Sequence, residues 1–183
     1  MMKQIRLAAY AAAVFAVFFL MTGCGGKKPQ DVISEELGID VSGGREVSNL
    51  DSHGGFHGDG TTCIVLQFSD ERVLEQIKED EQWKAFPLDE VTGTLVYGTE
   101  RKAENETGNE KENRIESIGP FLTDGEGEAL IPEIEDGYYR LIDRQVKPGE
   151  AAGADILHRS SFNFTLGIYD AGTDRLYFCK LDT

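Results

Sequence analysis

Residues 161–181 read SFNFTLGIYDAGTDRLYFCKL, and this stretch decides the fold class. Large apolar side chains recur at every second position of its first half: Phe162, Phe164, Leu166 and Ile168. This two-residue period is that of a β-strand. Asp170–Asp174 has the composition of a turn, and Arg175–Leu181 returns as a second strand. The stretch is the clearest β-hairpin of the chain and predicts an antiparallel sheet.

Further strands are expected at four earlier segments: Arg45–Asp51, Thr61–Phe68, Thr92–Tyr97 and Tyr138–Asp143. The second segment has the clearest alternation. One face holds Thr62, Ile64, Leu66 and Phe68, and the other holds Cys63, Val65 and Gln67. It is therefore the best candidate for a strand of the sheet in the first half of the chain.

One main helix is expected after this strand. Ser69 or Asp70 can cap a helix that runs to about Asp80, with an apolar stripe formed by Val73, Leu74 and Ile77. A brief helix over Asp31–Leu37 would end at Gly38. These elements predict an α+β fold: a mainly antiparallel sheet of five or six strands with one helix packed on one face.

Residues 98–117 differ in composition from the rest of the chain. Charged and amide side chains dominate this segment, and large apolar ones are scarce. Such a segment cannot bury enough apolar surface to offset its ordering entropy. We therefore expect a mobile acidic insert here.

The N-terminus has the three parts of a secretion signal. Lys3 and Arg6 give a basic start, and Leu7–Met21 is apolar or small apart from Tyr10. This apolar run is short for a transmembrane helix, which needs roughly 20 residues. It is followed by Leu20-Met21-Thr22-Gly23-Cys24.

That pentapeptide resembles the lipobox of bacterial lipoproteins, although Met21 stands where leucine is commonest. The resemblance implies cleavage after Gly23, a thioether-linked lipid on Cys24 and acylation of the new amino group by a fatty acid such as palmitate. Two or three acyl chains suffice for stable membrane attachment. The alternatives are an uncleaved N-terminal anchor and an ordinary signal peptide with an incidental cysteine.

The expected organisation is a signal peptide (1–23), a lipidated tether (24–30) and a single α+β domain (31–183). Loss of Lys3 and Arg6 with the signal takes the net charge from −15 to −17. So acidic a surface repels phosphate backbones, which argues against nucleic-acid binding. It is also repelled by anionic lipid headgroups, so attachment would rest on the lipid. The expected location is the extracytoplasmic face of the cell membrane.

The two remaining cysteines, Cys63 and Cys179, lie in strand-like apolar runs. A disulfide requires Cα atoms within about 7 Å, and the sequence does not show that these two residues come so close. Buried free thiols are therefore the favoured interpretation. If their strands are neighbours, a disulfide in an oxidising compartment is the alternative. The apolar surroundings argue against a reactive cysteine.

One loop holds possible metal ligands. Asp51-Ser-His53-Gly-Gly-Phe-His57-Gly-Asp59-Gly60 places two imidazoles and two carboxylates within nine residues, and His158 could complete a site. The spacing matches no established zinc signature. Asp and His that stabilise turns, or a loop that binds a partner, are the favoured interpretation.

A second acidic run, Asp124-Gly-Glu126-Gly-Glu128, matches only the acidic end of a calcium loop. No Gly-x-Ser-x-Gly elbow and no phosphate-binding loop is present in the sequence. We therefore assign no catalytic residue.

The whole chain is similar to small uncharacterised lipoproteins of Gram-positive bacteria. The similarity rests on the 52–60 loop, the 161–170 strand and the closing Leu-Tyr-Phe-Cys strand. It implies a location and no activity. The first hypothesis is a non-enzymatic binding domain with a protein or small-molecule partner. The alternatives are a divalent-metal-binding protein that uses His53, His57 and Asp59, and an envelope assembly component without a ligand.

Overall fold

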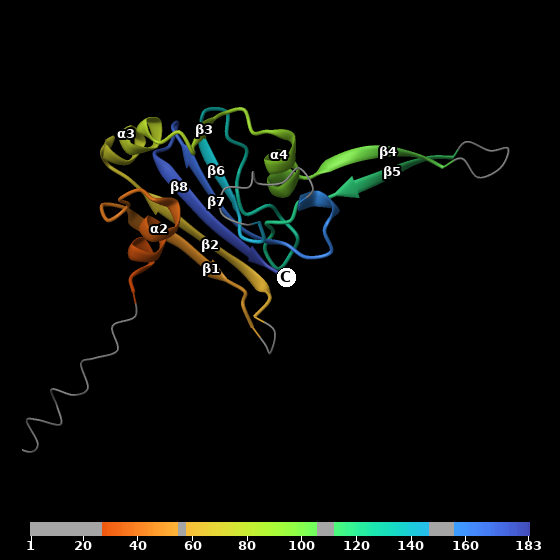
Figure 1. Ribbon diagram of the computed structural model, residues 1–183, viewed down its shortest axis with the longest axis horizontal. Coiled ribbons are helices and arrows are strands. Elements are labelled where there is room, and N and C mark those ends of the chain that lie inside the picture. The colour runs from red at the N-terminus through yellow and green to blue at the C-terminus, as the bar shows by residue number, and fades with distance from the viewer. Residues whose placement is uncertain (1–26, 55–57, 106–111, 147–155) are drawn as a thin grey trace, which may run out of the picture.

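The fold is built on a six-stranded antiparallel sheet (Figure 1). The computed structural model describes residues 27–54, 58–105, 112–146 and 156–183. Along the sheet the strands follow the order β1 (Arg45–Asp51), β2 (Gly60–Gln67), β8 (Arg175–Asp182), β7 (Asn163–Asp170), β6 (Gly137–Asp143) and β3 (Lys84–Ala85). The predicted α+β class and mainly antiparallel sheet are confirmed. So is the 161–181 hairpin, which pairs Phe164 with Leu181 and Asp170 with Arg175.

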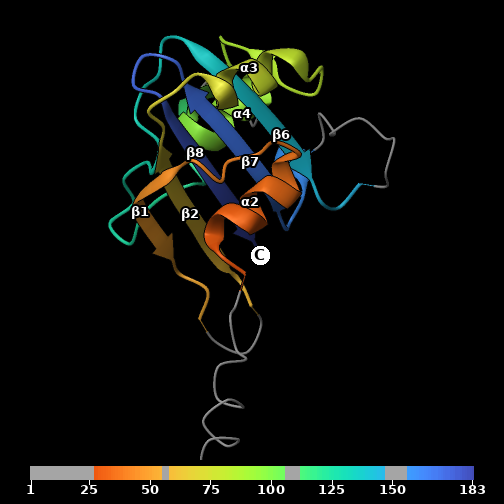
Figure 2. The same cartoon turned by 90° about the vertical axis from the view of Figure 1, so that its left-hand side faces the viewer.

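Both faces of the central strands β2, β8 and β7 are buried, which differs from the prediction of one helix on one face. Helices α2 (Pro29–Leu37) and α3 (Arg72–Glu79) lie on one side, and α4 (Glu90–Tyr97) lies on the other (Figures 1 and 2). Strand β2 shows why. Cys63 and Val65 belong to the core beneath α4, whereas Ile64, Leu66 and Phe68 belong to the core beneath α2 and α3. The alternation was predicted correctly, but apolar side chains on both faces require cover on both.

Helix α4 corrects the strand expected over Thr92–Tyr97. The carboxylate of Asp89 accepts a hydrogen bond from the Thr92 N–H at 2.8 Å, which caps the first turn of a helix. Gly98 ends that helix two turns later. Leu95 and Val96 are fully buried against the sheet. The cap and this burial outweigh the strand preference of the β-branched residues in the segment.

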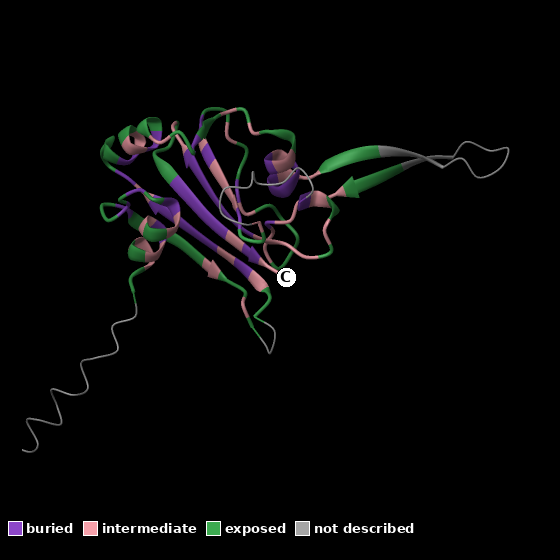
Figure 3. Cartoon of the chain, in the orientation of Figure 1, coloured by how far each residue is buried: buried purple, intermediate pink, exposed green. Residues whose placement is uncertain are grey.

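The segment 98–117, expected to be a mobile insert, contains a two-stranded antiparallel sheet. Strands β4 (Thr99–Asn105) and β5 (Glu112–Ile118) pair from Thr99–Ile118 to Asn105–Glu112. We call this hairpin the arm, because it projects from the body of the domain (Figures 1 and 3). Its ladder depends on backbone hydrogen bonds, which a search for apolar side chains does not detect.

The arm joins the body through a narrow base. An ideal Cβ placed on Gly119 would lie 3.3 Å from the Cα of Gly98 and 2.6 Å from the carbonyl oxygen of Thr94. Both glycines also have positive φ, 76° and 70°. Only residues without a Cβ allow the two ends of the arm to approach so closely.

Cys63 and Cys179 form a disulfide between β2 and β8, which corrects the favoured interpretation of free thiols. The two residues lie directly opposite one another in the ladder, with Cα atoms 4.1 Å apart. Both are buried. Sequence alone did not show that these strands are neighbours, and their pairing is what brings the two sulfur atoms together.

Candidate functional site

The residues predicted as metal ligands lie around the end of the β1–β2 hairpin and beyond it. His53 follows β1, Asp59 precedes β2, and His158 ends a short 3₁₀ helix over Ile156–His158. His57 lies outside the described residues, as does the lipidation residue Cys24. In the described part of the chain, no three His, Cys, Asp or Glu side chains are placed to hold a metal ion.

His53 is held instead between two carboxylates. Its Nδ1 lies 2.7 Å from Asp51 Oδ1, and its Nε2 lies 3.2 Å from Asp182 Oδ2. Asp51 ends β1 and Asp182 ends β8, and the two strands are separated in the sheet by β2. The imidazole therefore spans the end of three neighbouring strands.

The backbone at this corner fits the imidazole closely. The N–H of His53 donates to Asp51 Oδ1 at 3.0 Å, which forms a tight turn after β1. Thr62 Oγ1 of β2 lies 3.2 Å from the Nδ1 of His53. A Cβ on Gly60 would lie 2.7 Å from the His53 Cα, so a glycine is needed where the returning chain passes.

Asp182 connects this histidine to an arginine. Its Oδ1 pairs with Arg144 Nη2 at 2.7 Å, while its Oδ2 faces His53. Arg144 Nη2 also donates to the carbonyl oxygens of Phe164 and Leu181, at 3.1 and 3.0 Å. The guanidinium thus ties together the ends of β7 and β8. We call Asp51, His53, Arg144 and Asp182 the corner cluster.

The corner cluster favours a protonated His53. The hydrogen bond with Asp51 is the largest influence and raises the pKa of His53 above 6.5, with Asp182 adding to it and burial opposing it. The backbone N–H of His53, followed by its ring, lowers the pKa of the Asp51 carboxyl. In its protonated form, His53 lies between two carboxylates. Both ring nitrogens face carboxylate oxygens at hydrogen-bonding distance.

Sequence reasoning missed Asp182 and Arg144. They lie 129 and 91 positions from His53, and only the strand order brings them to the same corner. The available signal was a charged residue at the end of one apolar strand, Asp182 in β8, and directly after another, Arg144 after β6. Among the residues predicted as metal ligands, His53 lies in one cluster with Asp182 and Arg144. The part of the metal hypothesis that involves His57 stays a prediction.

The acidic run at Asp124 forms a turn. The Asp124 carboxylate accepts hydrogen bonds from the N–H groups of Glu126 and Glu128, at 2.8 and 3.0 Å. Its own N–H donates to the Glu128 carbonyl oxygen. This is the local bonding by which Asp commonly stabilises turns.

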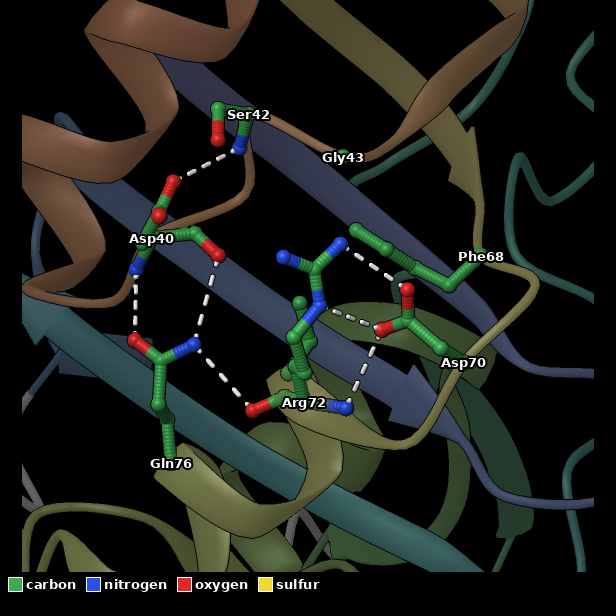
Figure 4. A pocket seen from close by; sticks show the side chains of 8 residues that line it. Asp40, Ser42, Gly43, Phe68, Asp70, Arg72 and Gln76 are labelled. Atoms are coloured by element: carbon green, nitrogen blue, oxygen red, sulfur yellow. Dashed lines mark hydrogen bonds and ion pairs between the residues drawn. The ribbon is translucent and has the colours of Figure 1, made fainter.

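A shallow polar depression lies between α3 and the chain that follows α2 (Figure 4). Arg72 pairs with both carboxylate oxygens of Asp70, at 3.0 and 2.9 Å. Across the depression, Gln76 accepts from the N–H of Asp40 at 2.8 Å. These side chains bond to one another, and their effect is to fasten residues 38–44 to α3.

Two partly buried ion pairs brace the body. Lys180 Nζ lies 2.8 Å from Glu36 Oε1, and Thr165 donates to the other oxygen of Glu36, which fixes α2 on β7 and β8. Asp143, whose side chain is fully buried, pairs with Arg159 Nη1 at 2.7 Å. Such pairs fix the geometry of packing more than they add stability.

Comparison with known proteins does not extend this description, because no protein-family model, curated protein or solved structure matches the chain. Among the described residues, no helix is long and apolar enough to cross a membrane. The fold alone classifies the protein: it is an α+β domain with a disulfide-linked antiparallel sheet and a projecting arm.

Proposed function

We propose that this chain is a non-enzymatic binding domain, held by a lipid on Cys24 at the extracytoplasmic face of a bacterial membrane, which contacts a protein partner through its arm. The observation that carries the proposal is the arm itself. A two-stranded hairpin is marginally stable in water without further packing. An element that projects from the body in this form gains most from a surface supplied by another molecule.

The side chains at the base of the arm support this role. Thr99, Glu100, Arg101, Glu116 and Ser117 are exposed, and Ile115 is 60% exposed. An isoleucine that loses most of its solvent contact on binding contributes about 1–2 kcal/mol. In such an interface the apolar side chain of Ile115 would lie at the centre and its polar neighbours at the rim.

The disulfide supports the location. Disulfides form and persist in oxidising compartments and are rare in the cytosol. The Cys63–Cys179 bond joins two central strands, so the folded sheet is suited to the outside of the cell.

The short tether supports close attachment. Four residues separate Cys24 from Pro29, where α2 begins. Even fully extended, such a tether reaches roughly 17 Å. Helix α2 and the arm lie at opposite sides of the body (Figure 1). The arm, with strands of seven residues, would then extend a further ~23 Å from the body.

Photo-crosslinking in intact cells tests the role of the arm. A photoreactive amino acid replaces Ile115, and a matched control carries it at the exposed Glu75 of α3. We expect a discrete protein adduct from position 115 and none from position 75. Equal labelling at both positions, or no adduct at 115, contradicts the proposed role of the arm.

A second variant separates the arm from the body. Deletion of residues 99–118 joins Gly98 directly to Gly119, which already lie side by side. We expect this variant to fold and reach the membrane. It should no longer compete with the full-length chain for the partner identified by crosslinking. For the anchor, Cys24→Ala should move the protein from the detergent phase to the aqueous phase in detergent partitioning. Unchanged partitioning contradicts lipidation at Cys24.

A further inference from the structure

The two sulfur atoms of the Cys63–Cys179 bond are out of reach once the domain has folded. Cys63 is 3% exposed and Cys179 is fully buried. Both belong to the core beneath α4, together with Leu95 and Val96 of that helix, which are fully buried themselves. An oxidant as large as a protein cannot contact either sulfur through such close packing. The oxidant therefore acts before the core beneath α4 closes.

Strand pairing imposes the opposite requirement. The two cysteines are 116 positions apart in the chain, and the β2–β8 ladder is what places them opposite one another, with Cα atoms 4.1 Å apart. A disulfide needs Cα atoms within about 7 Å. The sulfurs therefore meet only as β8 joins β2, which is also a step in the closing of this core. Formation of the bond thus needs two stages, in which an oxidant reacts with an accessible thiol and strand pairing then brings the second thiol to it.

We propose that Cys63 reacts first, by forming a mixed disulfide with a protein oxidant at the outer face of the membrane, and that Cys179 displaces this oxidant as β8 pairs with β2. The oxidant belongs to the class of thiol–disulfide exchange proteins, which carry a reactive pair of cysteines. This order of reaction rests on the proposed export of the chain and goes beyond the proposed role of the arm.

The order of the chain favours Cys63. A chain exported with its N-terminus first presents Cys63 while the 116 residues up to Cys179 are still to come. If export keeps pace with synthesis at 5–20 residues per second, this interval lasts roughly 6–23 s. The one other cysteine of the chain is Cys24, whose sulfur cannot exchange once it carries a thioether-linked lipid. Cys63 therefore has no partner in its own chain during the interval, and a mixed disulfide occupies its sulfur until Cys179 arrives.

The two steps are balanced exchanges. The Cys63 thiolate attacks one sulfur of the oxidant's disulfide, and the oxidant's other sulfur leaves as a thiolate. The Cys179 thiolate then attacks the Cys63 sulfur, and the bond between Cys63 and the oxidant breaks. The chain gains one disulfide and gives up two electrons, which reduce the disulfide of the oxidant to two thiols. The protons of the two cysteine thiols end on these sulfurs.

Trapping in cells that export the full chain tests the proposal. Cys179→Ala removes the thiol that displaces the oxidant, so a covalent adduct with a second protein should appear within the export interval and persist. Samples are pulse-labelled, quenched with acid at short intervals, alkylated and separated without reductant. In the matched control Cys63→Ala, any adduct should appear only after the interval, when Cys179 has been exported. The double variant should form none.

Peptide mapping of the short-lived adduct of the wild-type chain should place the oxidant on Cys63. An adduct on Cys179, equal timing in the two single variants, or a free Cys63 thiol in exported Cys179→Ala would overturn the proposal. Fractionation of the same samples reports export separately, so a chain that stays in the cytoplasm contradicts the proposed location instead. The adduct forms before the domain folds, so the result does not depend on the stability of either variant.

Access to the sulfur atoms is tested on the purified protein. The folded, oxidised chain should resist dithiothreitol at a concentration that opens the bond rapidly in urea, because Cys63 and Cys179 are buried only in the folded state. Equal rates of reduction with and without urea would show that the packing does not exclude a thiol reagent. That result would remove the reason for an oxidant that acts before folding.

Discussion

Breaking the Cys63–Cys179 disulfide should destabilise the domain more than any single side-chain replacement. The two residues are 116 positions apart, so the bond closes a loop that includes most of the domain. In the chain-entropy model a loop of this length constrains the unfolded state by about 5 kcal/mol. That is comparable to the whole stability of many domains of this size, which is about 5–15 kcal/mol.

The assay is urea unfolding monitored by the single tryptophan, Trp83, which is buried in the core beneath α2 and α3. With a urea dependence of about 2 kcal/mol per molar, loss of the cross-link should lower the midpoint by roughly 2.5 M. The background should carry Cys24→Ser, so that Cys63 and Cys179 are the only thiols. Reduction is the cleaner perturbation, because it leaves the volume of the core unchanged.

A double variant, Cys63→Ala with Cys179→Ala, is the matched control. It should unfold at a similarly low midpoint and should not respond to reductant. If the oxidised and reduced proteins instead unfold at the same urea concentration, the bond does not constrain the unfolded chain as argued. Two free thiols in the unreduced, denatured protein would show that the bond is absent.

Three further predictions concern the body. Burial alone would raise the pKa of Asp89, but hydrogen bonds from Thr92 and Lys84 hold it at about 2. The contribution of Asp89 to the free energy of unfolding should be present above pH 4 and disappear as the pH falls through 2. With allowance for the exposure of the side chain, it amounts to about 1 kcal/mol. The stability of Asp89→Asn, measured over the same acid range, should lack this component. Gly167→Ala would place a Cβ 2.8 Å from the Trp83 ring, so it should cost about 1–3 kcal/mol and shift the tryptophan emission, whereas Gly125→Ala, with open space around it, should do neither. Glu36→Gln should lower the melting temperature by a few degrees through its lost pair with Lys180, and an unchanged value would show that this pair contributes nothing.

The parts of the fold that could be predicted are those that depend on local periodicity. The alternation of Phe164, Leu166 and Ile168 located β7, and the two faces of β2 were assigned correctly. The strand expected in place of α4 shows the limit of this reasoning. Val91, Thr92 and Val96 favour strands, and the capping carboxylate of Asp89 outweighed that preference.

The candidate site was predictable only in part, because its members come from distant segments. The glycine-rich segment around His53 identified it as a candidate, but its partners depend on which strands are neighbours. The same strand order decides the fate of Cys63, since β8 rather than β1 carries the second cysteine. A local pattern identifies reactive groups, whereas pairing between distant strands decides what they contact.

The position of β2 also determines when the protein can fold. Its side chains are buried on both faces, and one of its edges is covered only by β8, which comes more than 100 residues later in the chain. Until β8 is present, β2 is an apolar strand with an open edge, and Cys63 is an unpaired thiol. Such intermediates fold slowly and are prone to aggregate. The edge of β2 that β8 covers is therefore the part of the sheet that stays open longest as the chain is made.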